Sequence, residues 1–158
     1  RHCLMDEEVG YVQGMADLAL PFARAFQDQS VALKCFYSLM RSLRCNFLET
    51  TSEDGMDQQL ARLRDVISQC APLLCEYLKF NRESDSLFFA YRWLLVLFRR
   101  ELDFNEADRL WDVMFAGKAS GVASISEYKI YFALAMILVH RDTFMRTCSR
   151  FEDLLIVK

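Results

Sequence analysis

Residues 87–102 read LFFAYRWLLVLFRREL, with apolar side chains at nearly every position. A helix over this stretch has no broad polar face, and a helix that is apolar on all sides is buried inside a larger assembly. We therefore predict a helix from Leu87 to about Leu102 as the central buried element of the chain. Ser84 or Asp85 is the expected N-cap, because short polar side chains satisfy the first free backbone N–H groups of a helix.

The residues before this stretch contain further helical patterns. Ser30 is a good N-cap, and apolar residues then recur at helical spacing as far as Leu43. A second amphipathic stripe covers residues 56–67, after a polar segment. Pro72 breaks that pattern and, because proline suits the first turn of a helix, opens a short helix that reaches Leu78.

Helical patterns also follow the central stretch. Asp103 or Asn105 caps the next amphipathic helix, which ends before a Gly- and Ser-containing loop at residues 117–124. A second strongly apolar helix covers about residues 126–140, and Asp142 begins a terminal one.

The composition of the chain agrees with an all-α fold. Its 158 residues correspond to one ordinary domain. Hydrophobic residues make up 53%, enough for a large core. Only 5 Gly and 2 Pro occur, which is sparse punctuation for a β protein that turns about every ten residues. We expect about seven packed helices without a sheet or an internal repeat.

Charge and cysteine usage exclude several classes of function. The formal net charge is -3 and the pI is about 5.4, whereas a nucleic-acid binder shows a basic surface. The most apolar runs, at residues 94–98 and 130–139, fall short of the roughly 20 residues that a membrane span needs, and no secretory signal is recognised. Six cysteines without a C-x-x-C pair and only 2 His predict no metal site and a reducing, intracellular setting.

The common catalytic motifs do not occur in the sequence. It contains no G-x-x-x-x-G-K-[ST] phosphate loop, no G-x-S-x-G elbow and no H-E-x-x-H pair. The acidic pairs Glu7–Glu8 and Glu53–Asp54 are interpreted as solvated loop charges, because a catalytic carboxylate dyad needs burial. The sequence therefore does not indicate a free-standing enzyme.

One short motif stands apart from the helical patterns. The sequence GYVQGM begins at Gly10, directly before a helical run that starts near Met15. Glycine permits tight turns and close backbone approach, so this loop can present Gln13 at the N-terminus of the helix. A carboxamide both donates and accepts hydrogen bonds, and can therefore orient a water. The alternative is an ordinary polar loop residue between capping glycines, and spacing alone favours that simpler interpretation.

The neighbours of Gln13 are candidates for supporting this loop. Gly10 and Gly14 provide the turns. Tyr11 either orients the loop or contacts a partner, and a packed aromatic beside the turn is an equal alternative. For Asp17 we expect a structural role, in which it caps the helix or accepts hydrogen bonds from the loop backbone.

Charged and aromatic residues elsewhere have simpler interpretations. For Arg92 and Arg100 with Glu101, an intramolecular ion pair is preferred over a contact with a partner. Trp93 and Trp111 have apolar neighbours and are predicted to lie in the core. Four further arginines are interpreted as a solvated face, with a membrane or an acidic partner as the alternative. They are Arg41, Arg44, Arg62 and Arg64.

The GYVQGM segment, followed by ADL at residues 16–18, resembles the Y-x-Q-G region of the TBC-domain GTPase-activating proteins, which act on Rab GTPases. Segments within residues 32–47 resemble the next helix of that family. Residues 87–102 are similar to its R-W-L-L-x-x-F-x-R-E-[FL] segment, and residues 109–114, RLWDVM, to its L-W-[DE] segment. These motifs cover residues 9–115 in the family's order, and the rest of the chain agrees in hydrophobic pattern.

The resemblance implies an all-helical fold and an enzyme activator rather than an enzyme. In this family two side chains enter the nucleotide site of a Rab-family small GTPase. The glutamine of Y-x-Q-G, here Gln13, positions the attacking water, and an arginine of an I-x-x-D-x-x-R motif stabilises the charge of phosphoryl transfer. The activator needs no cofactor of its own, since Mg²⁺ and GTP belong to the partner. A role in vesicle trafficking from the cytoplasm is implied, with recruitment to endomembranes through the GTPase left open.

The sequence departs from the family pattern at the arginine. No I-x-x-D-x-x-R motif precedes Tyr11, and Arg1, which stands where Met would begin a complete chain, lacks that context. We expect residues 1–158 to be a partial TBC-like domain, its C-terminal portion, with the arginine in a preceding part. Two alternatives remain: a module of the same fold that binds a GTPase or scaffold without activating it, and a structural domain in which Gln13 is incidental. Burial of Gln13 would exclude both roles that face a partner.

Overall fold

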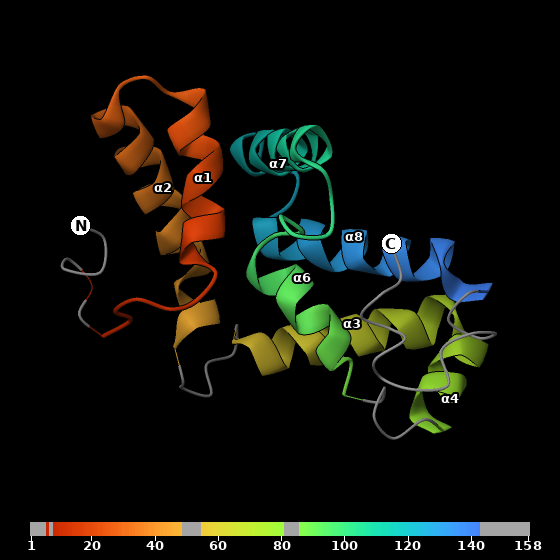
Figure 1. Cartoon of the computed structure of the whole chain (residues 1–158). Coiled ribbons are helices and arrows are strands. Elements are labelled where there is room, and N and C mark those ends of the chain that lie inside the picture. Colours follow the sequence, from red (N-terminus) through yellow and green to blue (C-terminus); the bar gives the residue numbers. More distant parts are fainter. Residues whose placement is uncertain (1–5, 7, 49–54, 81–85, 143–158) are drawn as a thin grey trace.

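The computed structural model of the protein describes residue 6 and residues 8–48, 55–80 and 86–142 (Figure 1). Helices and turns make up these ranges and no strand occurs in them, which confirms the predicted all-α architecture. The elements are α1 (Met15–Ala25), α2 (Gln29–Leu43), η2 (Arg44–Phe47), α3 (Met56–Cys70), α4 (Pro72–Phe80), η3 (Phe88–Ala90), α6 (Tyr91–Leu95), α7 (Phe104–Ala119) and α8 (Ile125–Val139). The predicted caps Ser84 and Asp85, the residues Glu7, Glu53 and Asp54, and the terminal helix beyond Asp142 lie outside the described ranges.

The helices form a hairpin attached to a larger helical group. α1 and α2 lie side by side and are joined by a short turn, at the left of Figure 1. α3 packs against α4 and α8, and α7 packs against α8. The short helix α6 lies between these parts and contacts both α3 and α8. Within the described ranges, no helix is both long enough and apolar enough to span a membrane.

A continuous apolar core joins the hairpin to the other helices. Leu18 and Phe22 are buried on α1, and Trp111 and Met114 are buried on α7. The rings of Phe22 and Trp111 have centroids 6.0 Å apart, and Phe115 lies within 6.2 Å of Phe22. Packing of these aromatic rings therefore holds the C-terminal half of α1 against α7.

A small polar cluster lies within the core where η2, α3, α6 and α8 meet. The side-chain amide of Gln59 donates a hydrogen bond to Asn46 Oδ1 at 2.7 Å. The fully buried Lys129 ammonium group donates to the same oxygen at 3.4 Å and to the Leu94 carbonyl at 3.5 Å. These hydrogen bonds join the four elements inside the core.

α7 and α4 begin as predicted, and α7 and α8 both begin at capping boxes. Asp103 accepts a hydrogen bond from the Glu106 backbone and Glu106 accepts one from the Asp103 backbone, which forms a capping box at α7. Ser124 and Glu127 form the same arrangement at α8. The hydrogen bond from the Ser124 backbone is the main cause of a lowered pKa of the Glu127 carboxyl. α4 begins at Pro72, as its fixed φ favours.

Two predicted boundaries are wrong. α2 begins before Ser30, because the Asp28 side chain accepts a hydrogen bond from the Ser30 backbone N–H at 2.7 Å and is the actual N-cap. The loop predicted at residues 117–124 begins later, since α7 continues to Ala119. Packing of this last turn of α7 against α8 stabilises the helical conformation there.

Residues 87–102 are buried as predicted, but they do not form one helix. α6 is short, and turns occupy residues 96–101. Leu87, Leu97 and Phe98 have φ angles of 52°, 50° and 60°. This left-handed conformation costs an L-residue with a side chain about 1–2 kcal/mol, so it persists only where other contacts stabilise it.

Tertiary contacts stabilise the left-handed conformation at Leu97 and Phe98. The Trp111 indole N–H donates to the Leu97 carbonyl at 2.9 Å, and the Phe98 backbone N–H donates to the Trp93 carbonyl at 2.9 Å. The Phe98 ring packs edge-to-face on Phe132, with centroids 4.7 Å apart. The chain turns here because these contacts outweigh the helical preference of the local sequence.

We expect Trp111→Phe to lower the free energy of unfolding by about 1–2 kcal/mol more than Trp93→Phe. Both tryptophans are buried, as predicted, but in the described residues only Trp111 uses its indole N–H, toward the Leu97 carbonyl. The exchange to Phe leaves that buried carbonyl without its donor, while at Trp93 it removes apolar area alone. Urea denaturation of the two variants measures the difference, and equal losses would contradict a stabilising role for this hydrogen bond.

Candidate functional site

The GYVQGM segment forms a loop that leads into α1 (Figure 1). Val9 before the loop and Met15 at the start of α1 are both buried, so the loop is anchored in the core on either side. The Gly10 backbone N–H donates to the Asp6 carbonyl at 2.9 Å, and the Met15 N–H donates to the Val12 carbonyl at 3.2 Å. These contacts fix the two ends of the loop, and Tyr11 and Gln13 between them are exposed.

Gly14 is the most constrained residue of the loop. It is the N-cap of α1 with a φ of 107°, a conformation that residues with a side chain rarely adopt. A Cβ atom there would lie 2.9 Å from Val96 Cγ1 and 3.8 Å from Leu95 Cδ2. Gly10 has a φ of 60°, but no atom lies within 4 Å of its ideal Cβ position. The loop therefore touches the end of α6 closely at Gly14 and turns freely at Gly10.

Gln13 and Tyr11 are the exposed side chains of this loop. Gln13 directly precedes the N-cap of α1, so the burial that would exclude a role toward a partner is not observed. Tyr11 is 68% exposed, which rules out the alternative of an aromatic packed beside the turn. Both side chains are available to a molecule that approaches the N-terminal end of α1.

Asp17 has a structural role, although not the predicted one. No side chain caps α1, because Gly14 occupies the N-cap position. The Asp17 carboxylate instead accepts two hydrogen bonds from Arg100, from Nη2 at 2.8 Å and from Nε at 3.1 Å. The hydrogen bond to Asp17 is the main cause of a raised pKa of the Arg100 guanidinium. The first turn of α1 is thus tied to the segment that follows α6.

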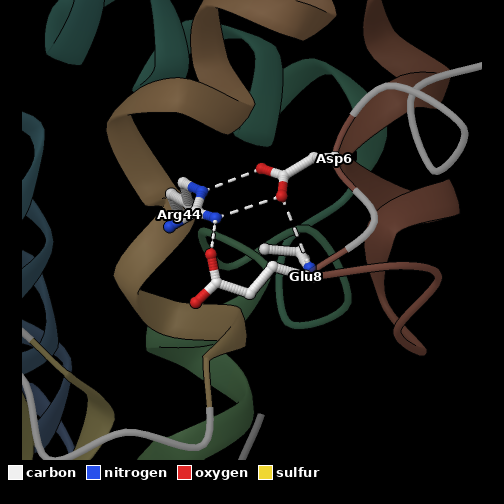
Figure 2. A network of polar contacts seen from close by, with 4 residues as sticks. Asp6, Glu8 and Arg44 are labelled. Carbon is white, nitrogen blue, oxygen red and sulfur yellow. Dashed lines mark hydrogen bonds and ion pairs between the residues drawn. The ribbon is translucent and has the colours of Figure 1, made fainter.

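A second ionic contact lies on the N-terminal side of the loop. Arg44, at the start of η2, donates from Nε to Asp6 Oδ2 at 2.8 Å and from Nη2 to Asp6 Oδ1 at 3.1 Å (Figure 2). The same Nη2 group donates to Glu8 at 2.5 Å. These hydrogen bonds, chiefly the one to Asp6, raise the pKa of Arg44 above its already high ordinary value. Glu8 is 64% exposed, as predicted for a solvated loop charge, whereas Arg44 is 37% exposed and is paired with Asp6 and Glu8 rather than only solvated.

The prediction that Arg92 and Arg100 form ion pairs within the chain is confirmed. Arg92 Nε lies 2.7 Å from Glu101 Oε1, across the turn that follows α6. Arg100 is paired with Asp17 rather than with a residue of its own segment. Together these pairs hold both sides of the turn at residues 96–101 in place.

Sequence reasoning missed three residues that surround the loop: Asp6, Arg44 and Val96. Asp6 and Arg44 are 38 residues apart in the chain, and Arg100 and Asp17 are 83 apart. A single sequence contains no spacing signal for contacts of such length. Charge complementarity was the one available hint, and it does not select partners among 19 basic and 22 acidic residues.

The arrangement can do one kind of chemistry. It presents an exposed carboxamide, Gln13, from a loop whose backbone is fixed on both sides. Such a group can accept a hydrogen bond from a water and donate one to an anion at the same time. In the described part of the chain, no group of three or more His, Cys, Asp or Glu side chains is arranged to hold a metal ion.

Comparison with known proteins agrees with the motifs. The family model described as Rab-GTPase-TBC domain matches residues 2–145. The chain is 36% identical over 144 residues to human TBC1 domain family member 17, a match that covers 91% of this chain and 21% of that protein. It is 37% identical over 150 residues to the GTPase-activating protein gyp7 of Schizosaccharomyces pombe, with 95% of this chain and 19% of that protein covered.

A third relative extends the comparison to another group of proteins. Small G protein signaling modulator 1 of Mus musculus is 32% identical over 148 residues, which is 94% of this chain and 13% of that protein. The chain thus spans between an eighth and about a fifth of these relatives. The family match covers nearly all of the chain, including the Gln13 loop. The chain therefore belongs to the Rab-GTPase-TBC domain family.

Proposed function

We propose that this chain is part of an activator that stimulates GTP hydrolysis by a Rab-type small GTPase, with Gln13 as its glutamine finger. The observation that carries the proposal is the exposed Gln13 side chain on a loop held at Val9, Gly14 and Met15. A side chain that acts in the nucleotide site of another protein must be exposed and also held in a defined position. The family relationship and the name of the gyp7 relative support the same assignment.

The physical role of Gln13 follows from the nature of phosphoryl transfer. This reaction is accelerated mainly by positioning and by electrostatic stabilisation, with little covalent work for a protein to do. The Gln13 carboxamide oxygen accepts a hydrogen bond from the attacking water, and its N–H group donates to an oxygen of the partner's nucleotide site. GTP and Mg²⁺ belong to the partner, and the chain needs no cofactor of its own.

A second catalytic group completes the proposal. An arginine that stabilises the developing charge is worth on the order of 10³–10⁵ in rate. We place it in an I-x-x-D-x-x-R motif that precedes this chain in the longer protein. The same activity implies regulation of vesicle trafficking, with the activator in the cytoplasm and brought to membrane surfaces by its GTPase.

Single-turnover GTP hydrolysis across a panel of Rab proteins tests the proposal. With the full-length protein, we expect acceleration of one or a few Rabs, and Gln13→Ala should reduce it by about tenfold or more. The matched control is Gln58→Ala, which removes the same exposed carboxamide from α3. It should leave the acceleration unchanged.

The other outcomes of this test separate the alternatives. Binding of a Rab without any acceleration would favour a non-activating GTPase-binding or scaffold module. Acceleration that does not depend on Gln13 would assign catalysis to other residues.

A further inference from the structure

Two arginine–carboxylate contacts lie on either side of the Gln13 loop. Asp6 stands seven residues before Gln13 and is held by Arg44, while Asp17 stands four residues after it and is held by Arg100. Both arginines come from distant parts of the chain. The loop and its catalytic candidate are therefore enclosed between two long-range ionic contacts.

The Arg44 contact acts on the turn that precedes the loop. Arg44 engages both oxygens of Asp6, an arrangement that fixes direction as well as distance (Figure 2). Asp6 in turn accepts the backbone N–H of Gly10 on its carbonyl at 2.9 Å and that of Val9 on Oδ1 at 3.4 Å. The buried Leu43 beside Arg44 anchors this end of α2 in the core. Arg44 thus sets the point at which the loop begins.

The Arg100 contact acts on the first turn of α1. Both Nε and Nη2 of Arg100 donate to Asp17 Oδ2. Arg100 belongs to the same turn as Val96, whose side chain stands directly against Gly14. Leu97 and Phe98 between them are fully buried, so this turn is a rigid support. It contacts the loop through Val96 at Gly14 and the first turn of α1 through the ion pair between Arg100 and Asp17.

We propose that Arg44 and Arg100 are positioning residues that hold the Gln13 loop from its two ends in the orientation required for GTP hydrolysis. The inference rests on the proposed function of Gln13. Neither guanidinium is placed in the reaction itself, since each is already engaged by carboxylates of this chain. Their effect passes through Gln13.

The energetics of exposed ion pairs distinguish a positioning role from a contribution to global stability. The Arg44 and Arg100 side chains are 37% and 41% exposed, and pairs with such exposure contribute little to global stability. A displacement of about 1 Å in a catalytic group, by contrast, can reduce turnover by about 100-fold. At its other end α1 remains docked, because the Arg24 guanidinium lies 4.4 Å from the centre of the Phe104 ring. Loss of a contact should therefore disturb the loop and leave the fold intact.

The first test measures GTP hydrolysis by the accelerated Rab with the full-length protein. Arg44→Gln and Arg100→Gln should each lower the rate at saturating activator by about tenfold. In a Gln13→Ala background the same substitutions should change the rate by less than about twofold, because the group they position is absent. Matched controls are Arg41→Gln on α2 and Arg109→Gln on α7, two exposed arginines without an ion pair in the described residues.

The second test reads the loop directly and needs no GTPase. Amide hydrogen exchange of residues 9–15 should be faster by about threefold or more in Arg44→Gln and Arg100→Gln, and unchanged in both controls. Arg44→Lys, which cannot engage both oxygens of Asp6, should give an exchange rate between those of the unchanged protein and Arg44→Gln.

The outcomes distinguish a failure of the positioning role from a failure of the proposed function of Gln13. Activity losses that persist in the Gln13→Ala background would overturn positioning and indicate a direct contact with the partner or a general structural role. Unchanged exchange at residues 9–15 would also overturn it, whatever the kinetics show. If Gln13→Ala itself leaves activity intact while exchange responds to both arginines, the contacts hold the loop as described and the proposed function of Gln13 is what fails.

Discussion

Replacing Gly14 with alanine is expected to lower the free energy of unfolding by about 2–4 kcal/mol. Two effects add at this position. The φ of 107° is strained for any residue with a side chain, and the new Cβ would lie 2.9 Å from Val96 Cγ1. Val96 is itself buried and β-branched, so it cannot move aside without disturbing the turn after α6. Because Gln13 adjoins Gly14, acceleration of GTP hydrolysis should fall as well.

Gly10→Ala is the matched control for this experiment. Gly10 also has a positive φ, of 60°, but its ideal Cβ position meets no atom within 4 Å. The change should lower the free energy of unfolding by only about 1 kcal/mol, from backbone strain alone. Urea denaturation, monitored by the circular dichroism signal of the helices, gives the free energy of unfolding of both variants. Equal losses at Gly10 and Gly14 would show that the contact between the loop and α6 is not tight.

Gly117→Ala is expected to lower the free energy of unfolding by about 1–3 kcal/mol, although alanine favours a helix more than glycine does. Gly117 is buried within α7, and a Cβ atom there would overlap the Tyr128 ring of α8. The ring must move or the two helices must separate, and either change reduces their packing. The loss should appear as a lower urea midpoint with an unchanged denaturant dependence.

A double-mutant cycle assigns this effect to the tyrosine ring. In a Tyr128→Ala background the ring is absent, so Gly117→Ala should be neutral or stabilising by up to about 1 kcal/mol. The coupling between the two positions is the quantity measured. A loss at Gly117 that is the same in both backgrounds would mean that another contact at this helix crossing is responsible.

The sequence contains enough information to predict most of the helices, because their signals are local. The capping box at Asp103 and Glu106 and the proline at the start of α4 act through residues within one turn, and the structure shows both. The Gln13 motif also stands directly before a helix, as predicted. Local preference and tertiary structure agree at these places.

Prediction fails where packing overrides local preference. Residues 87–102 are apolar almost throughout and contain neither Gly nor Pro, so nothing in the sequence marks the turn at Leu97 and Phe98. That turn depends on a hydrogen bond from Trp111, 14 residues further along the chain. The close contact at Gly14 exists only because the chain turns here, so the sequence alone cannot reveal that contact either.

The support of the Gln13 loop could not be predicted for a similar reason. Asp17 reads as a helix cap in sequence, because acidic residues favour the first turn of a helix. Its partner, Arg100, becomes available only through the unexpected turn after α6. Arg44 reads as one of several solvated arginines, and only the folded chain brings it to Asp6.

One measurement tests the central claim most directly: the dependence of single-turnover GTP hydrolysis on activator concentration, for the full-length protein and its Gln13→Ala variant with the Rab that responds. A group that acts only in the transition state changes the saturating rate, whereas a binding contact changes the concentration for half-saturation. We predict a saturating rate lowered by about tenfold or more and a half-saturating concentration altered by less than about threefold. An unchanged saturating rate, with a shift confined to the half-saturating concentration, would contradict the catalytic role of Gln13 and make it a binding residue.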